Sequence, residues 1–325
     1  MPDKPRLLQI GSVTDPEAAR AMTERLSKGF DVALLADQPD QAAFLKRHGP
    51  EFVAVATFSG VTDEAMAAMP NLKVISSYGV GYDNINAAGA AGRGVIVAHT
   101  PDVLNDEVAD TAIMLWLAVS RELLPSERWA RSGQWETTGE AYRLTRSVRR
   151  RSVGIVGMGR IGQTIARQVG MFDAKVMYHA RSKKDVPYAY HADLVEMARA
   201  ADVLIVITPG GAATRHLVSR EVIEALGPDG ILINVARGSV VDEAALVAAL
   251  QSGKLGGAGL DVFEAEPKIP DALKTMENVV LLPHVGSATV ETRAAMGDLV
   301  CRNLESWLET GRVVAPVPEC RALNG

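Results

Sequence analysis

Three residues of this sequence, Arg237, Glu266 and His284, have side chains that could together reduce a carbonyl group. An arginine can bind a carboxylate and a neighbouring carbonyl oxygen through paired hydrogen bonds. A histidine can give a proton to that oxygen as hydride reaches the carbonyl carbon. A carboxylate beside the histidine orients it and keeps it protonated near neutral pH. The three residue types therefore suit reduction of a 2-keto acid.

Each of these residues also has an ordinary explanation when taken alone. Arg237 could form a surface ion pair, Glu266 could belong to a turn, and His284 could be a structural group. All three, however, lie at or just beyond the end of an aliphatic run. Open α/β sheets place their ligand crevice at the carboxyl ends of strands, so the combination indicates an active site.

A glycine motif in the middle of the chain indicates a dinucleotide cofactor. The aliphatic run Val153–Val156 leads directly into G-x-G-x-x-G, and a helical pattern over 161–169 follows. In such a motif the first glycine allows a tight turn, the second lets the backbone approach the pyrophosphate, and the third permits close packing of helix on strand. A purely structural turn is the alternative. Cofactor contacts are expected along the whole turn: Gly157, Met158, Gly159, Arg160, Ile161 and Gly162.

The residues after the next strand favour NADPH over NADH. A site that prefers NAD has an acidic residue about 20 positions after the glycines, which binds the ribose 2′-hydroxyl. Here Ala180 is followed by Arg181, Ser182 and Lys183, and no carboxylate occurs before Asp185. These three donors suit a 2′-phosphate. A solvated basic loop is the alternative, and use of NADH stays possible.

The elements that must position these residues form two series of strands. Runs of aliphatic residues without polar alternation predict strands buried on both faces, and their alternation with helical stretches is typical of a doubly wound parallel sheet. A helical stretch over Leu104–Ala130 separates the two series, so we expect an α/β protein with two domains. The predicted strands are Leu7–Ile10, Asp31–Leu35, Phe52–Ala56, Lys73–Ser77, Val95–Ala98, Val153–Val156, Lys175–Tyr178, Val203–Ile207, Ile231–Asn234, Gly257–Leu260 and Val279–Leu282.

Composition excludes several other classes of protein. The net charge of −5 argues against a nucleic-acid or anionic-membrane partner, which usually goes with a basic excess. Met1–Ile10 has no apolar run of the kind found in signal peptides. Cys301 and Cys320 have no ligand-like spacing, so neither a disulfide framework nor a metal site is expected. We expect a cytoplasmic protein.

The chain resembles the D-isomer-specific 2-hydroxyacid dehydrogenase family, and especially its glyoxylate/hydroxypyruvate reductase branch. The resemblance rests on the glycine motif and on the segments Asn234–Asp242, Gly259–Pro267 and Pro283–Thr289, which occur in family order and spacing. It implies that Arg237, Glu266 and His284 are catalytic and that the product is a D-2-hydroxy acid.

The family fold implies two doubly wound parallel-sheet domains, Rossmann-like and flavodoxin-like, with an active-site cleft between them. By this resemblance, residues 1–100 and 286–325 form the substrate domain, and residues 101–285 form the NAD(P)-binding domain. The segment Trp129–Arg146 resembles the dimerisation arm of the family, which implies a homodimer, although its aromatic residues could equally belong to a core.

The resemblance also implies further contacts. Backbone amides of Val80 and Gly81 would bind the substrate carboxylate, in a glycine-containing loop able to form an anion nest. Ser287 would touch the substrate together with Arg237 and His284. Asp261 would contact the nicotinamide carboxamide. Besides the glycine turn and the basic loop, the expected cofactor contacts are Val235, Ala236, Arg237, Asp261, His284 and Gly286.

Three alternative functions share these motifs. An NAD-linked D-2-hydroxyacid dehydrogenase of the same fold is disfavoured by Arg181. Formate oxidation requires an amide side chain beside the histidine, where this chain has Glu266. A non-catalytic, nucleotide-sensing corepressor-like protein would keep the same motifs, and only measured turnover separates it from an enzyme.

Overall fold

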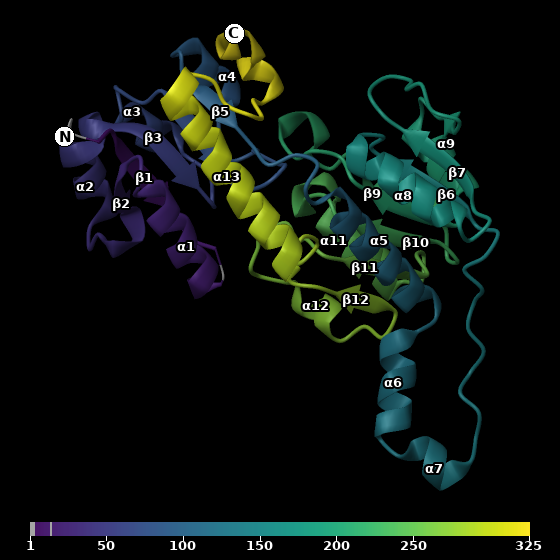
Figure 1. Ribbon diagram of the computed structural model, residues 1–325. Helices are drawn as coiled ribbons and strands as arrows, with labels where there is room; N and C mark the ends of the chain where they lie inside the picture. The colour runs from purple at the N-terminus through teal and green to yellow at the C-terminus, as the bar shows by residue number, and fades with distance from the viewer. Residues whose placement is uncertain (1–3, 14) are drawn as a thin grey trace. The chain divides into compact units, whose positions relative to one another are not determined.

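The computed structural model describes residues 4–13 and 15–325, and the chain divides into two compact units (Figure 1). One unit contains Met1–Leu104 and Thr289–Gly325, and the other contains Asn105–Ala288. Both boundaries lie a few residues C-terminal of those expected from the sequence. The expectation of no signal peptide in Met1–Ile10 falls partly on residues 1–3, which lie outside the described residues.

The first unit is built on a parallel sheet whose five strands, within the described residues, follow the order β2-β1-β3-β4-β5. This is the flavodoxin-like order of a doubly wound sheet. Its strands carry apolar residues on both faces, and Leu7, Leu8, Val55 and Ile75 are completely buried. The strands are β1 (Arg6–Ile10), β2 (Asp31–Leu34), β3 (Phe52–Thr57), β4 (Val74–Ser77) and β5 (Ile96–Ala98).

Helices of the first unit begin at side chains that accept backbone N–H groups. Asp40, for example, accepts from Ala43 N at 2.9 Å and Thr62 accepts from Ala65 N at 3.1 Å. Such caps satisfy donors that the first helical turn leaves unpaired. The helical elements are α1 (Pro16–Leu26), η1 (Leu35–Asp37), α2 (Gln41–His48), η2 (Gly49–Glu51), α3 (Asp63–Ala67), α4 (Ala87–Gly92), α13 (Val290–Thr310) and η5 (Pro318–Asn324).

The second unit holds a seven-stranded parallel sheet, of order β12-β11-β10-β9-β6-β7-β8. The strand β6, which comes first in the chain, lies between β7 and β9 in this sheet, so the strand order reverses at β6. Doubly wound sheets bind their ligands at such a reversal. The strands are β6 (Ser152–Val156), β7 (Lys175–His179), β8 (Ala189–Tyr190), β9 (Val203–Val206), β10 (Ile231–Asn234), β11 (Gly257–Leu260) and β12 (Val279–Leu281). The short strand β8 was not predicted.

Three helices of this unit precede its first strand in the chain: α5 (Asn105–Ser120), α6 (Leu123–Arg131) and α7 (Gln134–Thr138). The helices that connect its parallel strands are α8 (Arg160–Gly170), α9 (Leu194–Ala200), η3 (Ala212–Thr214), α10 (Arg220–Leu226), η4 (Gly238–Val240), α11 (Glu243–Gln251) and α12 (Asp271–Lys274). The prediction of two doubly wound parallel α/β domains is confirmed. No helix in the described part of the chain has the length and apolar character needed to cross a bilayer.

The predicted helical stretch over Leu104–Ala130 is present, but it consists of two helices, α5 and α6, and not of one. The helix is interrupted between α5 and α6, where Glu122 adopts a left-handed φ of 49°. Pro125 explains the break, because inside a continuous helix its ring would clash with the carbonyl four residues earlier. In the first turn of α6 that clash is avoided. Glu122 is held in place by Tyr142, whose hydroxyl donates to its carboxylate at 2.9 Å.

Candidate active site

The three candidate catalytic residues follow three neighbouring strands. Arg237 follows β10, Glu266 follows β11 and His284 follows β12, and these strands pair in parallel, β10 with β11 and β11 with β12. The loops also touch, since a Cβ on Gly238 would lie 1.9 Å from the carbonyl carbon of Phe263. The second unit therefore gathers the loops of all three residues at one edge of its sheet.

His284 and Glu266 form a direct pair. Nδ1 of His284 lies 2.8 Å from Oε2 of Glu266, and Oε1 of the same carboxylate accepts the N–H of Phe263 at 2.9 Å. Partial burial alone would raise the pKa of Glu266. The hydrogen bonds from His284 and Phe263, with the charge of nearby Arg237, outweigh burial and lower this pKa. Glu266 is thus a fixed carboxylate that leaves the other ring nitrogen of His284, Nε2, to act on a substrate.

The backbone of His284 adopts a left-handed φ of 55°, which non-glycine residues rarely do. Asp261 holds the chain in this conformation. Its carbonyl accepts the N–H of His284 at 2.8 Å, and its carboxylate accepts those of Val285 and Gly286 at 2.7 and 2.8 Å. Burial raises the pKa of Asp261, and the two amide donors oppose that effect. Asp261 therefore shapes the loop that presents the histidine.

The turn that presents Arg237 is shaped by Asn234. This buried side chain accepts the N–H of Ala236 at 3.1 Å and donates to the carbonyl of Arg237 at 3.1 Å. Arg237 is half-buried, and its Nη1 donates to the carbonyl of Ala236 at 2.7 Å. Asn234 fixes the backbone on both sides of the turn. It therefore sets the direction in which the Arg237 side chain extends from the turn.

The pairing of Glu266 with His284 leads to a prediction for E266Q. The hydrogen bonds to Glu266 outweigh its burial and lower its pKa, so it pairs with the His284 ring as a carboxylate. In E266Q an amide takes the place of that carboxylate and orients the ring less well, so kcat/KM for reduction of a 2-keto acid at neutral pH should fall about tenfold. Steady-state kinetics checks this. The control E264Q, in the same loop, should keep the wild-type kcat/KM, and an unchanged kcat/KM in E266Q would contradict the prediction.

The glycine turn has the geometry that a dinucleotide requires. Gly157 has φ of 108°, and a Cβ there would lie 2.6 Å from the carbonyl oxygen of Ile207. A Cβ on Gly162 would lie 2.1 Å from the carbonyl oxygen of Gly157, so helix α8 packs directly on the turn. A Cβ on Gly159 would meet no atom within 4 Å. The amino end of α8 is therefore open to a phosphate group.

The basic loop after β7 is exposed but firmly held. The hydroxyl of buried Tyr178 accepts the N–H of Lys184 at 2.7 Å and donates to the carbonyl of Lys184 at 3.2 Å. Tyr190 donates to the carbonyl of Ala180 at 3.3 Å. The exposed residues Arg181, Ser182 and Lys183 lie between these fixed points. The loop can thus offer cationic donors to a phosphate without first becoming ordered.

The remaining predicted residues fall into three groups. Val235, Ala236 and Gly286 are buried beside the turns just described, and Met158 is only 2% exposed, so its side chain packs in the core. Ser287 is half-buried, close after His284. Val80 and Gly81 belong to the first unit, where they follow β4 in a half-exposed loop. The assignments of all these residues to cofactor or substrate stay predictions.

The supporting roles of three residues were missed by the sequence reasoning. Asn234 shapes the Arg237 turn, Tyr178 anchors the basic loop, and Asp261, predicted as a nicotinamide contact, holds the His284 loop. Each is a polar residue at or next to the end of an aliphatic strand, which is a usable signal. A buried polar group has to be satisfied by hydrogen bonds, so it is a good candidate for holding an adjacent turn.

Comparison with known proteins finds a matching family model and relatives that align with most of this chain. Residues 113–286 match the family model described as D-isomer specific 2-hydroxyacid dehydrogenase, NAD binding domain. Hydroxyphenylpyruvate reductase of Plectranthus scutellarioides is 45% identical over 299 residues, which cover 91% of this chain and 95% of the relative. Glyoxylate/hydroxypyruvate reductase A HPR2 of Arabidopsis thaliana is 44% identical with the same coverage.

A solved structure extends the similarity to nearly the whole chain. The NADPH-dependent glyoxylate/hydroxypyruvate reductase of Sinorhizobium meliloti, in complex with NADP and malonate, is 46% identical and superimposes with a TM-score of 0.91. The match covers 98% of each chain.

Proposed function

The chain belongs to the D-isomer-specific 2-hydroxyacid dehydrogenase family, and we propose from this that it reduces a small 2-keto acid of the glyoxylate or hydroxypyruvate type to the D-2-hydroxy acid. The observation that carries the proposal is the pairing of His284 with Glu266 at 2.8 Å, on loops that meet the loop of Arg237. Two of the relatives named above are glyoxylate/hydroxypyruvate reductases, and the third is a hydroxyphenylpyruvate reductase.

The residues divide the chemistry between them. Arg237 binds the carboxylate and the carbonyl oxygen of the substrate through its planar fork of donors. His284 donates a proton from Nε2 to the carbonyl oxygen, and Glu266 keeps the ring oriented through Nδ1. Amides of Val80 and Gly81 hold the carboxylate, and Ser287 contacts the substrate beside His284.

NADPH is the proposed cofactor, and when bound it supplies the hydride. The residues present fit this group, because the turn at Gly157–Gly162 leaves the amino end of α8 open and the loop after β7 offers cationic donors. Arg181, Ser182 and Lys183 hold the 2′-phosphate. The Sinorhizobium meliloti reductase, described as NADPH-dependent, supports this choice. NADH remains usable at lower affinity, since it makes the same pyrophosphate contacts.

Replacing Arg181 should separate the two nucleotides. In R181A one charge-assisted hydrogen bond to the 2′-phosphate is lost, so KM for NADPH should rise about 10- to 30-fold, while KM for NADH changes by less than about threefold. Steady-state kinetics with both nucleotides checks this. R199A, which removes an exposed arginine from α9, is the control and should alter neither value. An equal rise in KM for both nucleotides would contradict the assignment of Arg181 to the 2′-phosphate.

A panel of 2-keto acids tests the function itself. Glyoxylate, hydroxypyruvate, hydroxyphenylpyruvate and 2-ketogluconate are offered with NADPH, and its oxidation is followed by absorbance. We expect the highest kcat/KM with glyoxylate or hydroxypyruvate. A higher kcat/KM with NADH than with NADPH would favour the NAD-linked dehydrogenase. Tight binding of NADPH without turnover of any acid would favour the corepressor-like alternative.

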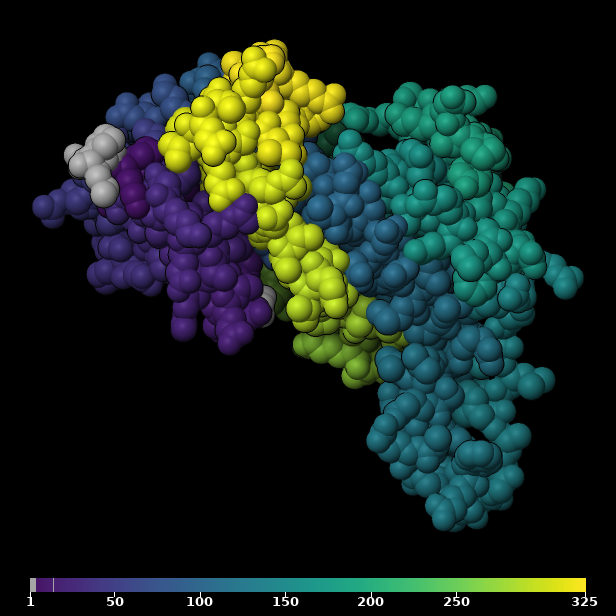
Figure 2. Space-filling model, in the orientation of Figure 1, coloured from purple at the N-terminus to yellow at the C-terminus, as the bar shows by residue number. Residues whose placement is uncertain are grey.

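We propose that the protein is a homodimer joined through α6, α7 and the segment that follows them to Arg146. Figure 2 shows these residues projecting from the rest of the second unit. Trp135 and Leu144 are 61% and 99% exposed there. Large apolar side chains on a projection are typical of a surface that another chain covers.

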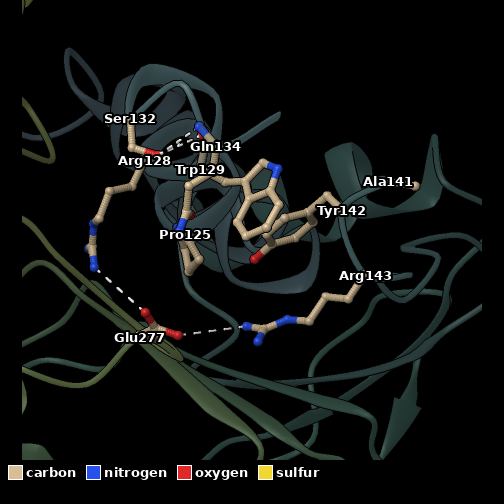
Figure 3. A pocket seen from close by; sticks show the side chains of 9 residues that line it. All are labelled: Pro125, Arg128, Trp129, Ser132, Gln134, Ala141, Tyr142, Arg143 and Glu277. Carbon is tan, nitrogen blue, oxygen red and sulfur yellow. Dashed lines mark hydrogen bonds and ion pairs between the residues drawn. The ribbon is translucent and has the colours of Figure 1, made fainter. Parts of the chain in front are cut away.

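A hollow of about 540 Å³ opens beside α6 in the same projection. Arg128 and Arg143 both extend toward Glu277 across it, at 3.7 and 3.9 Å (Figure 3). The other lining residues are Pro125, Trp129, Ser132, Gln134, Ala141 and Tyr142.

Light scattering tests the proposed dimer. We expect the wild-type protein to have a mass near twice that of one chain, and we expect L144E to shift the protein toward the monomer. A monomeric wild-type protein would exclude the dimer.

A cytoplasmic location is also proposed. Cys301 and Cys320 are both free and buried, as is usual where thiols are kept reduced. Fractionation of cells that produce the tagged protein checks this, and recovery in a membrane or secreted fraction would contradict it.

A further inference from the structure

Two carbonyl groups of the loop after β4 are held by consecutive residues at the end of β5. Thr100 donates its backbone N–H to the carbonyl of Gly79 at 2.9 Å. Nδ1 of His99 lies 3.0 Å from the carbonyl oxygen of Val80. A carbonyl oxygen can only accept, so the ring nitrogen at this contact carries the hydrogen and donates it.

These two bonds decide where the next two N–H groups point. In a planar trans peptide the carbonyl and the following N–H point in opposite directions. The carbonyl of Gly79 shares its peptide with Val80 N–H, and that of Val80 shares its peptide with Gly81 N–H. Both N–H groups are therefore directed away from residues 99 and 100. Within the described part of the first unit, neither N–H donates to a backbone carbonyl.

His99 is itself fixed on three sides. Its N–H donates to the carbonyl of Ala315 at 3.1 Å, and its carbonyl accepts from the amide of buried Asn303 at 3.2 Å. Its ring meets the ring of Tyr82 edge-on, with centroids 5.6 Å apart. A donor held this rigidly can hold the Val80–Gly81 peptide in one orientation. It also polarises that peptide, which makes Gly81 N–H a stronger donor.

We propose that His99 is a positioning residue for substrate binding, which holds the amides of Val80 and Gly81 ready for the carboxylate of the 2-keto acid. The inference rests on the proposed function, because the carboxylate is that of its substrate. Thr100 makes the equivalent bond from its backbone, so only the bond from His99 can be removed by changing a side chain.

Two variants at this position separate donation from packing. In H99L the side chain has no hydrogen-bond donor. In H99N the side-chain amide nitrogen is bonded to Cγ, as Nδ1 of histidine is, so it can donate from a similar position. We expect KM for the keto acid to rise about tenfold in H99L, the effect of losing about one hydrogen bond, with kcat and KM for NADPH within about threefold of wild type. H99N should restore the wild-type KM. H48L, at a half-buried histidine of the same unit, is the control.

Hydrogen exchange gives a second measurement that needs no turnover. The Thr100 amide, protected by its bond to Gly79, should exchange several-fold faster in H99L than in wild type or H99N. Unchanged exchange in H99L, an unchanged KM, or equal losses in H99L and H99N would each overturn the role of His99. If the wild-type protein reduced no keto acid, the proposed function would fail, and the exchange comparison would still decide whether His99 holds the loop.

Discussion

H284A should lose about 10²- to 10⁴-fold in kcat for 2-keto acid reduction, the usual contribution of a general acid. The substrate oxygen then has no proton donor, and Glu266 has no ring to orient. The dissociation constant for NADPH should stay within about threefold of wild type, because the glycine turn and the basic loop that we propose to bind it are untouched. Steady-state kinetics and a fluorescence titration with NADPH measure the two quantities separately.

The chain provides a matched control for this variant. His216 also pairs with a glutamate, with Nε2 3.2 Å from Oε1 of Glu264, and it also has a left-handed φ, of 50°. H216A therefore removes a similar pair with a similar backbone, and it should keep kcat. Wild-type turnover in H284A would remove His284 from the role of proton donor. Equal losses in the two variants would point to structural damage instead.

R237K should reduce kcat/KM for the keto acid about 10²-fold, although the positive charge is kept. A lysine cannot reproduce the planar fork, so two charge-assisted hydrogen bonds are weakened, at about 1.5 kcal/mol each. The carbonyl carbon is then held less accurately for hydride transfer. The loss should appear in both KM for the keto acid and kcat, while KM for NADPH changes little.

An exposed arginine of the same unit serves as the control for R237K. R220K alters the first residue of α10 and should leave kcat/KM unchanged. Thermal unfolding of both variants, within a few degrees of wild type, would show that the fold is intact. A KM for the keto acid that does not change in R237K would contradict the carboxylate-binding role.

The sheets were predictable because their signal is strong and local. Runs such as Ile231–Asn234 and Gly257–Leu260 coincide with β10 and β11, since uninterrupted aliphatic residues between helical stretches identify strands buried on both faces. The break at Glu122 was missed, although Pro125 marks a helix start. The strand β8, of only two residues, is too short to produce a pattern.

The grouping of the three candidate catalytic residues was predictable for a different reason. Arg237, Glu266 and His284 each follow a predicted strand, and parallel strands bring their carboxyl ends to one edge. The residues that hold the surrounding loops were harder to predict, because their roles depend on contacts between segments that are distant in the sequence. Asp261 reaches Val285 and Gly286, and His99 reaches Val80, through loop conformations that no spacing rule predicts.

The central claim is that this protein moves a hydride from NADPH to the carbonyl carbon of a 2-keto acid. The most direct test supplies hydroxypyruvate with NADPH deuterated at the transferred position of the nicotinamide, and examines the product by NMR and chiral chromatography. We predict D-glycerate carrying deuterium at C2, formed in proportion to the NADPH oxidised. Product without deuterium at C2, or the L-enantiomer, would contradict the account.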